Sequence, residues 1–272
     1  MRTVTSVLGT AAVRPISHRL RIRTACNALF AWMRMITSII LLTGKTEAAA
    51  LTGLFRKHND RLAIHAVHTL KELEALGPAV IRGSRLIGFV TPVVVPPRIL
   101  NALGFGAYNF RPGPPHYPGW VPAHFAIYDK ASTFGATAHR MAERVDAGAI
   151  IDAGLFVIPP GTSVRRLQEL AFVEAARLIW RLAPALATGS EPLPALPLQW
   201  SGVRSTKIGH RTMCDLSPDI PRLELEQRIK AFGDGDFGVD LTVTLHGHKF
   251  RYVPPEAEKP NERAVLRPAA LV

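Results

Sequence analysis

The chain has 272 residues, 47% of them hydrophobic and 20% charged, so it can bury a sizeable core and does not resemble an intrinsically disordered protein. The net charge is +12, but six arginines and no acidic residue lie in residues 1–34, so the rest of the chain is only mildly basic. Basic residues do not alternate with aromatic residues along a stripe, which argues against nucleic acid as a partner. The two cysteines, Cys26 and Cys214, form no CxxC pair, which argues against a disulfide framework and fits a reducing, cytoplasmic compartment.

The first 34 residues form an Arg-rich extension, which we treat apart from the folded body. Its composition resembles a transit peptide. The alternative, which we favour, is that translation starts at Met33 or Met35, because an apolar strand is predicted directly after them. The apolar run 28–43 is broken by Arg34 and is too short for a membrane span, so we expect no membrane segment.

Short apolar runs alternate with helical stretches over the first part of the chain. Strands are predicted at 38–43, 62–67, 85–90 and 107–110. Helices are predicted at 46–57, with Thr46 as the N-cap, at 69–76 and, in a shorter form, within 93–103. This alternation is typical of an α/β fold in which helices cover a mostly parallel sheet.

The second part of the chain begins with a loop at 111–119 that holds four prolines and cannot be helical. The elements expected after it are a helix at 120–129, strands at 135–141 and 150–157, a helix from Ser163 to about 186, a Pro-rich linker at 191–197, a helix at 223–232 and a hairpin at 239–253. We therefore divide the chain into the extension 1–34, a main domain 35–195, a small module 196–255 and a flexible tail 256–272.

Two patterns look functional but are rejected. The glycines of 233–238 match GxGxxG, yet they follow a helix and precede a strand, the reverse of a dinucleotide-binding fingerprint. His246 and His248 could share a metal, but no third ligand lies nearby in the sequence, so we expect no metal site.

An ordered series of motifs carries the functional interpretation. The segment 109–115 reads NFRPGPP and is followed by YPG at 117–119, FAIY at 125–128, GATAHRM at 135–141 and VDAGAII at 145–151. This series resembles the formyltransferases that use 10-formyltetrahydrofolate, and it is most similar to their amino-sugar branch. The resemblance extends over about residues 36–252.

The resemblance implies a Rossmann-like fold and transfer of a formyl group from 10-formyltetrahydrofolate, as co-substrate, to a small primary amine, such as an amino sugar carried on a nucleotide. The family's catalytic set is an Asn, a His two residues later and a distant Asp. Asn109 and Asp146 match the first and last, and Arg111 occupies the His position. Residues expected to contact substrate or co-substrate are Pro112, Gly113, Pro114, His116, His139 and Gly148.

The chemistry assigns a role to each member of this set. Asn109 would hold the formyl oxygen, and Asp146 would handle the amine proton. Arg111 could stabilise negative charge, but its pKa above about 12 prevents it from cycling a proton. His116 and His124 lie close enough in sequence to be considered as replacements for the missing His.

Three alternatives remain open at this stage. Arg111 favours a catalytically impaired, folate-binding relative. A methionyl-tRNA formyltransferase is the second alternative, although the members that act on transfer RNA carry a larger C-terminal domain than residues 199–255 could form. A nicotinamide oxidoreductase is the third, and it rests only on the fold class. The resemblance also allows a homodimer.

Overall fold

The computed structural model describes residues 36–201 and 203–254, and the predicted N-terminal extension and C-terminal tail lie outside these residues. No helix within the described ranges has the length and hydropathy that a membrane span requires.

Six strands form the main sheet, in the spatial order β2-β1-β3-β4-β5-β6. Their bounds are β1 Ser38–Leu42, β2 Ala63–Val67, β3 Ser84–Phe89, β4 Ala107–Arg111, β5 Thr133–Arg140 and β6 Ile150–Val157. Strands β2, β1, β3 and β4 are mutually parallel, whereas β5 runs antiparallel to both β4 and β6. The predicted α/β fold with a mostly parallel, Rossmann-like sheet is confirmed.

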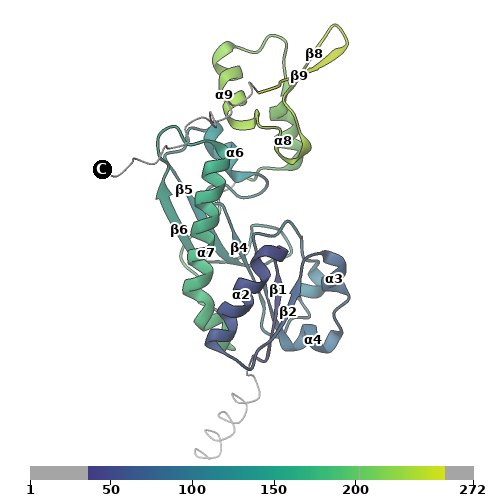
Figure 1. Cartoon of the computed structure of the whole chain (residues 1–272), viewed down its shortest axis with the longest axis vertical. Coiled ribbons are helices and arrows are strands. Elements are labelled where there is room, and N and C mark those ends of the chain that lie inside the picture. The colour runs from purple at the N-terminus through teal and green to yellow at the C-terminus, as the bar shows by residue number, and fades with distance from the viewer. Residues whose placement is uncertain (1–35, 202, 255–272) are drawn as a thin grey trace, which may run out of the picture. The chain divides into compact units, whose positions relative to one another are not determined.

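Helices cover both faces of this sheet, so β1 and β3 are buried along their whole length. The long helix α7 (Val164–Thr188) and α2 (Lys45–His58) lie side by side and share a core with Ile39 and Leu41 of β1 (Figure 1). Ile40 and Leu42 point to the opposite face. There they pack in a second core with residues of the short helices α3 (Leu70–Glu74), α4 (Pro78–Gly83) and α5 (Pro97–Leu100).

The C-terminal part of the chain adds a small module to α6 (Pro122–Tyr128) and the start of α7. It contains α8 (Lys207–Cys214), α9 (Arg222–Phe232) and a three-stranded sheet of β7 (Asp215–Leu216), β8 (Thr242–Leu245) and β9 (His248–Arg251), with a short 3-10 turn, Asp236–Gly238, before β8. Phe232 of α9 is buried in the same core as Ala126 of α6 and Leu167 of α7. The module therefore completes its hydrophobic core against the main sheet's helices.

Most predicted elements and two signals at their ends appear in the structure. The Ser163 side chain accepts the Arg166 N–H at the start of α7, and His246 and Gly247 both adopt positive φ in the β8–β9 hairpin turn. The predicted cap at Thr46 is wrong, because α2 begins at Lys45 with Gly44 as its N-cap. Helices α4 and α8 were not predicted. Pro78 opens α4 at a first-turn position where its missing N–H costs nothing.

Burial of His124 predicts a pH-dependent stability for this module. His124 is 2% exposed and stacks on Phe232, and burial lowers its pKa to about 4. Between about pH 6.5 and 4, His124 is protonated in the unfolded chain but stays neutral in the folded chain. Protonation therefore stabilises the unfolded state, and the free energy of unfolding falls as pH falls from about 6.5 towards 4. We expect wild type to lose about 2 kcal/mol more unfolding free energy than His124→Phe between pH 7 and 4.5, measured by urea titration. Equal losses would contradict this.

Candidate active site

Strand pairing brings the residues of the predicted catalytic set together. Asn109 and Arg111 lie two residues apart on β4, so their side chains leave the same face of the sheet. The antiparallel register places His139 of β5 directly opposite Asn109. Asp146 follows in the loop after β5, where it adopts a positive φ of 52°. Residues separated by up to 37 positions in the sequence thus meet beside the C-terminal end of β4.

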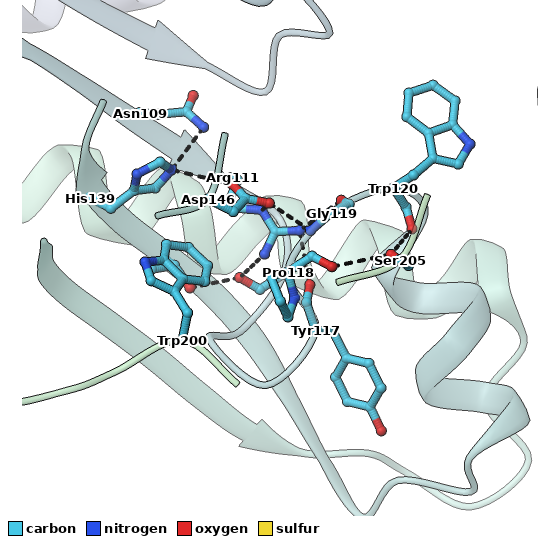
Figure 2. Close-up of polar contacts among 12 residues, drawn as sticks. Asn109, Arg111, Tyr117, Pro118, Gly119, Trp120, His139, Asp146, Trp200 and Ser205 are labelled. Carbon is cyan, nitrogen blue, oxygen red and sulfur yellow. Dashed lines mark hydrogen bonds and ion pairs between the residues drawn. The ribbon is translucent and has the colours of Figure 1, made fainter. Parts of the chain in front are cut away.

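His139 lies at the centre of this cluster and contacts two of its members (Figure 2). Its Nε2 atom is 3.2 Å from Asn109 Nδ2 and 3.6 Å from Asp146 Oδ1. Its Nδ1 atom is 2.9 Å from the carbonyl oxygen of Arg140. The ring is 3% exposed, and this burial lowers the pKa of His139, although the nearby Asp146 carboxylate opposes the shift. His139 is therefore held chiefly in its neutral form.

Arg111 turns away from this histidine and into the proline-rich loop. Nε lies 3.4 Å from Asp146 Oδ2. The terminal nitrogens donate to four main-chain carbonyls: NH1 to Gly113 and Pro114, both at 3.4 Å, and NH2 to Tyr117 at 3.0 Å and Gly119 at 3.2 Å. The four hydrogen bonds of the terminal nitrogens and the ion pair of Nε commit the guanidinium to the loop and to Asp146. Arg111 thus organises the loop.

The same carboxylate joins the loop to the cluster. Asp146 Oδ2 accepts the main-chain N–H of Gly119 at 2.6 Å and faces Arg111, while Oδ1 faces His139. Burial lowers the pKa of Arg111, and Asp146 opposes that shift, so the guanidinium and the carboxylate form a buried ion pair. Both oxygens of Asp146 are engaged by the protein.

A cavity of 1030 Å³ opens beside this cluster, at the carboxyl ends of β3 and β4, where open α/β sheets bind their ligands. Among the predicted site residues, the lining includes Asn109, Arg111, Pro112, His139 and Asp146. The remaining walls come from the segment after β3, from α7 and from the start of α8: Val90–Val95, Gln168, Glu169, Phe172, Val173 and Arg204–Lys207. The volume is sufficient for an organic ligand larger than most drugs.

The other predicted binding residues lie outside this lining. Gly113 and Pro114 contribute carbonyls to Arg111, and the Gly148 carbonyl accepts the indole N–H of Trp200 at 2.8 Å. His116 is exposed on the loop. Their contact with a ligand stays a prediction.

His124, considered as a replacement for the family His, also lies outside the cavity lining. It is buried against Phe232, in the core that α6 shares with the C-terminal module. His139 is therefore the histidine that contacts Asn109 and Asp146.

Two residues that support the site were not predicted. Trp200 packs edge-on against His139, with 5.0 Å between ring centroids. Gly88 of β3 pairs with Asn109, and a Cβ atom there would lie 2.9 Å from Asn109 Oδ1. A glycine inside an otherwise apolar strand was the available signal for such a close approach. No comparable signal marks Trp200.

No cluster of three or more His, Cys, Asp or Glu side chains that could hold a metal ion occurs in the described part of the chain. The side chains of the cluster offer an amide donor, a neutral imidazole and a buried carboxylate.

No protein-family model matches the chain. Among curated proteins, methionyl-tRNA formyltransferase of Enterococcus faecalis is 29% identical over 102 residues, which are 37% of this chain and 33% of that protein. The matched segment thus spans only about a third of that relative.

Solved structures match far more of the chain. A sugar N-formyltransferase from Shewanella superimposes with a TM-score of 0.65 at 18% identity, covering 82% of this chain and 99% of that one. A likely sugar N-formyltransferase from Mycobacterium tuberculosis superimposes with a TM-score of 0.61 at 19% identity. The match covers 82% of this chain and 100% of that one. The chain has the formyltransferase fold. A third structure with this fold is an N-formyltransferase from Helicobacter canadensis in complex with folinic acid and dTDP-3-aminofucose. It superimposes with a TM-score of 0.53 at 16% identity, and the match covers 78% of this chain and 85% of that one.

The Arg111 contacts predict a large stability loss on its removal. Arg111→Ala leaves Asp146 buried without its cation and removes the donor to the Tyr117 and Gly119 carbonyls, so we expect the unfolding free energy to fall by about 3–5 kcal/mol in urea titrations. Arg111→Lys should restore little of the lost unfolding free energy, because a single ammonium group cannot donate hydrogen bonds in the spread directions of a guanidinium. The exposed Arg144→Ala is the control and should change little. An Arg111→Ala protein as stable as wild type would refute the structural role.

The close approach at Gly88 predicts a second effect. Gly88→Ala places a Cβ 2.7 Å from Met141 Cε and 2.9 Å from Asn109 Oδ1, so neighbouring side chains must move. We expect a loss of about 1–3 kcal/mol of unfolding free energy. Gly53→Ala, where an added Cβ meets open space within a helix, is the matched control and should not destabilise. The prediction fails if the two alanines behave alike.

Proposed function

We propose that this protein transfers a formyl group from 10-formyltetrahydrofolate to a primary amine, and that the amine belongs to an amino sugar carried on a nucleotide. The observation that supports this most strongly is the cluster of Asn109, His139 and Asp146 at the wall of a large cavity, at the carboxyl ends of the parallel strands of a formyltransferase fold. The motif series that carries these residues points to the same chemistry.

Formyl transfer requires a donor for negative charge that develops on the formyl oxygen. In this proposal the Asn109 amide supplies it, because a side-chain amide nitrogen has two hydrogens and His139 uses one of them. Removal of one such donor typically slows acyl transfer by about 10²–10³-fold. Arg111 was expected to share this task, but its guanidinium is committed to the loop.

The walls of the cavity suit two anionic ligands. Arg204 and Lys207 bring positive charge to the lining, which favours the carboxylates of a folate and the phosphates of a nucleotide. Apolar side chains from the segment after β3 and from Phe172 and Val173 of α7 offer surface for a ring system. The ligands of the Helicobacter canadensis structure, folinic acid and a dTDP-linked amino sugar, combine these two chemistries.

A second candidate is a folate-binding protein without turnover, and Arg111 at the family's His position favours it. In that case the protein binds folate but releases no tetrahydrofolate, and Arg111→His creates activity. The five contacts of Arg111 argue against such a gain, because His cannot hold the four carbonyls.

The test uses the full chain and two measurements. Calorimetry with 5-formyltetrahydrofolate reports binding, for which we expect micromolar affinity. Release of tetrahydrofolate from 10-formyltetrahydrofolate is then followed with dTDP-3-aminofucose as acceptor, and with methionyl-tRNA as the alternative acceptor. We expect turnover with the amino sugar and a decrease in kcat of about 10²–10³-fold for Asn109→Ala. Asn101→Ala, an exposed asparagine, is the matched control and should behave as wild type.

The outcomes separate the candidates. Turnover with methionyl-tRNA alone would replace the amino sugar by transfer RNA. Binding without turnover would favour the non-catalytic relative. Well-folded protein that binds no folate would end the enzyme proposal, and with it the placement of this reaction in cytoplasmic one-carbon metabolism.

A further inference from the structure

The protonation state of His139 follows from its partners. Its Nδ1 atom lies 2.9 Å from the carbonyl oxygen of Arg140, and a carbonyl can only accept a hydrogen bond. Nδ1 therefore carries a hydrogen. A neutral imidazole has one donor and one acceptor nitrogen, so Nε2 presents a lone pair. Asn109 Nδ2, 3.2 Å away, donates to this lone pair.

The surroundings of the ring maintain this neutral form. Burial lowers the pKa of His139 below its ordinary value of 6.5, and the Arg111 cation acts in the same direction. The charged groups that face the ring are Asp146, from the loop after β5, and Arg111, from β4. The edge-on ring of Trp200 adds no charge. At neutral pH the cluster thus holds an unprotonated nitrogen at a cavity wall.

The other charged members of the cluster are less suited to accept a proton. Arg111 carries its charge permanently and donates its four hydrogen bonds to loop carbonyls. Asp146 forms an ion pair with Arg111 through Oδ2, which also accepts the Gly119 N–H. His139 Nε2 is the basic atom of the cluster that is not paired with the Arg111 cation.

We propose that His139 Nε2 is the proton acceptor of the reaction, in place of the residue that Arg111 has displaced. This inference rests on the proposed function. The lone pair of the acceptor amine forms a bond to the formyl carbon, and the C–O π pair moves to the oxygen. Nε2 takes one proton from the new ammonium. When the C–O π bond re-forms, the bond to N10 of the folate breaks, and N10 keeps that electron pair and receives the proton from Nε2.

Protonation of His139 Nε2 also affects Asn109, the proposed donor to the oxyanion. Once Nε2 is protonated it has no lone pair for Asn109, and Asp146 Oδ1 lies 3.6 Å from the new positive charge. The Asp146 carboxylate stabilises the imidazolium as a buried ion pair. Asn109 then no longer donates to His139, at the stage when the formyl oxygen carries the most charge.

His139→Asn is the decisive variant. Its side-chain amide can replace Nδ1–H in the hydrogen bond to Arg140, so it retains the structural contact of His139, but it offers no basic nitrogen. We expect kcat to fall by about 10²–10⁴-fold, while the affinity for 5-formyltetrahydrofolate stays within a few-fold of wild type. His65→Asn, which changes a histidine on the far edge strand β2, is the control and should leave both unchanged.

The pH profile separates proton transfer from a purely structural role. A base acts only when neutral, so wild-type kcat should fall as pH falls through the pKa of His139, at a pH below 6.5. The His139→Asn profile should lack this acidic limb. Wild-type kcat in His139→Asn, or an unchanged acidic limb, would overturn the proposal.

Nitrogen NMR of histidine-labelled protein gives a readout that needs no turnover. The resonances of His139, assigned by their loss in His139→Asn, should show the neutral Nδ1–H form at pH 7 and protonation only below pH 6.5. A charged ring or an Nε2–H form at pH 7 would overturn the proposal. A wild-type protein that shows the neutral Nδ1–H form but never releases tetrahydrofolate would instead locate the failure in the proposed function.

Discussion

The buried guanidinium of Arg111 is the contact on which the site depends. The loop 112–119 contains four prolines, which have carbonyls but no N–H donors, so it holds more acceptors than its own backbone can satisfy. Arg111 donates to four of these carbonyls and forms an ion pair with Asp146 through Nε. Because an unsatisfied buried polar group is costly, the loop and the arginine each require the other.

This arrangement explains how an arginine can occupy a position where the related family has histidine. The guanidinium is longer than an imidazole and is always charged, so it reaches past the cluster to the carbonyls beyond. Its charge remains close enough to pair with Asp146, and Asp146 in turn holds the Gly119 N–H and faces His139. Arg111 therefore supports the loop, and His139 is the histidine that contacts Asn109 and Asp146.

The remaining support comes from packing that excludes water. Gly88 of β3 leaves room for the side-chain oxygen of Asn109, and the Trp200 ring packs edge-on against His139. Each contact limits the space open to one side chain of the cluster. A cavity whose polar members are fixed in this way can stabilise developing charge without first reorganising.

The sequence by itself determined the class of fold and most of its elements, because alternating apolar runs and capping residues such as Ser163 are local signals. It also predicted Asn109 and Asp146 as site residues from contiguous motifs, and both line the cavity. It could not determine which way Arg111 turns or which histidine completes the cluster. Those outcomes depend on the register between β4 and β5, which sets His139 opposite Asn109, and on loop carbonyls that gather around Arg111 only when the chain is folded. The contact between His139 and Asn109 joins residues 30 positions apart, and the Arg111 contacts, although local, depend on the conformation of an irregular loop. Neither leaves a periodic pattern in the sequence, so only the tertiary structure decided them.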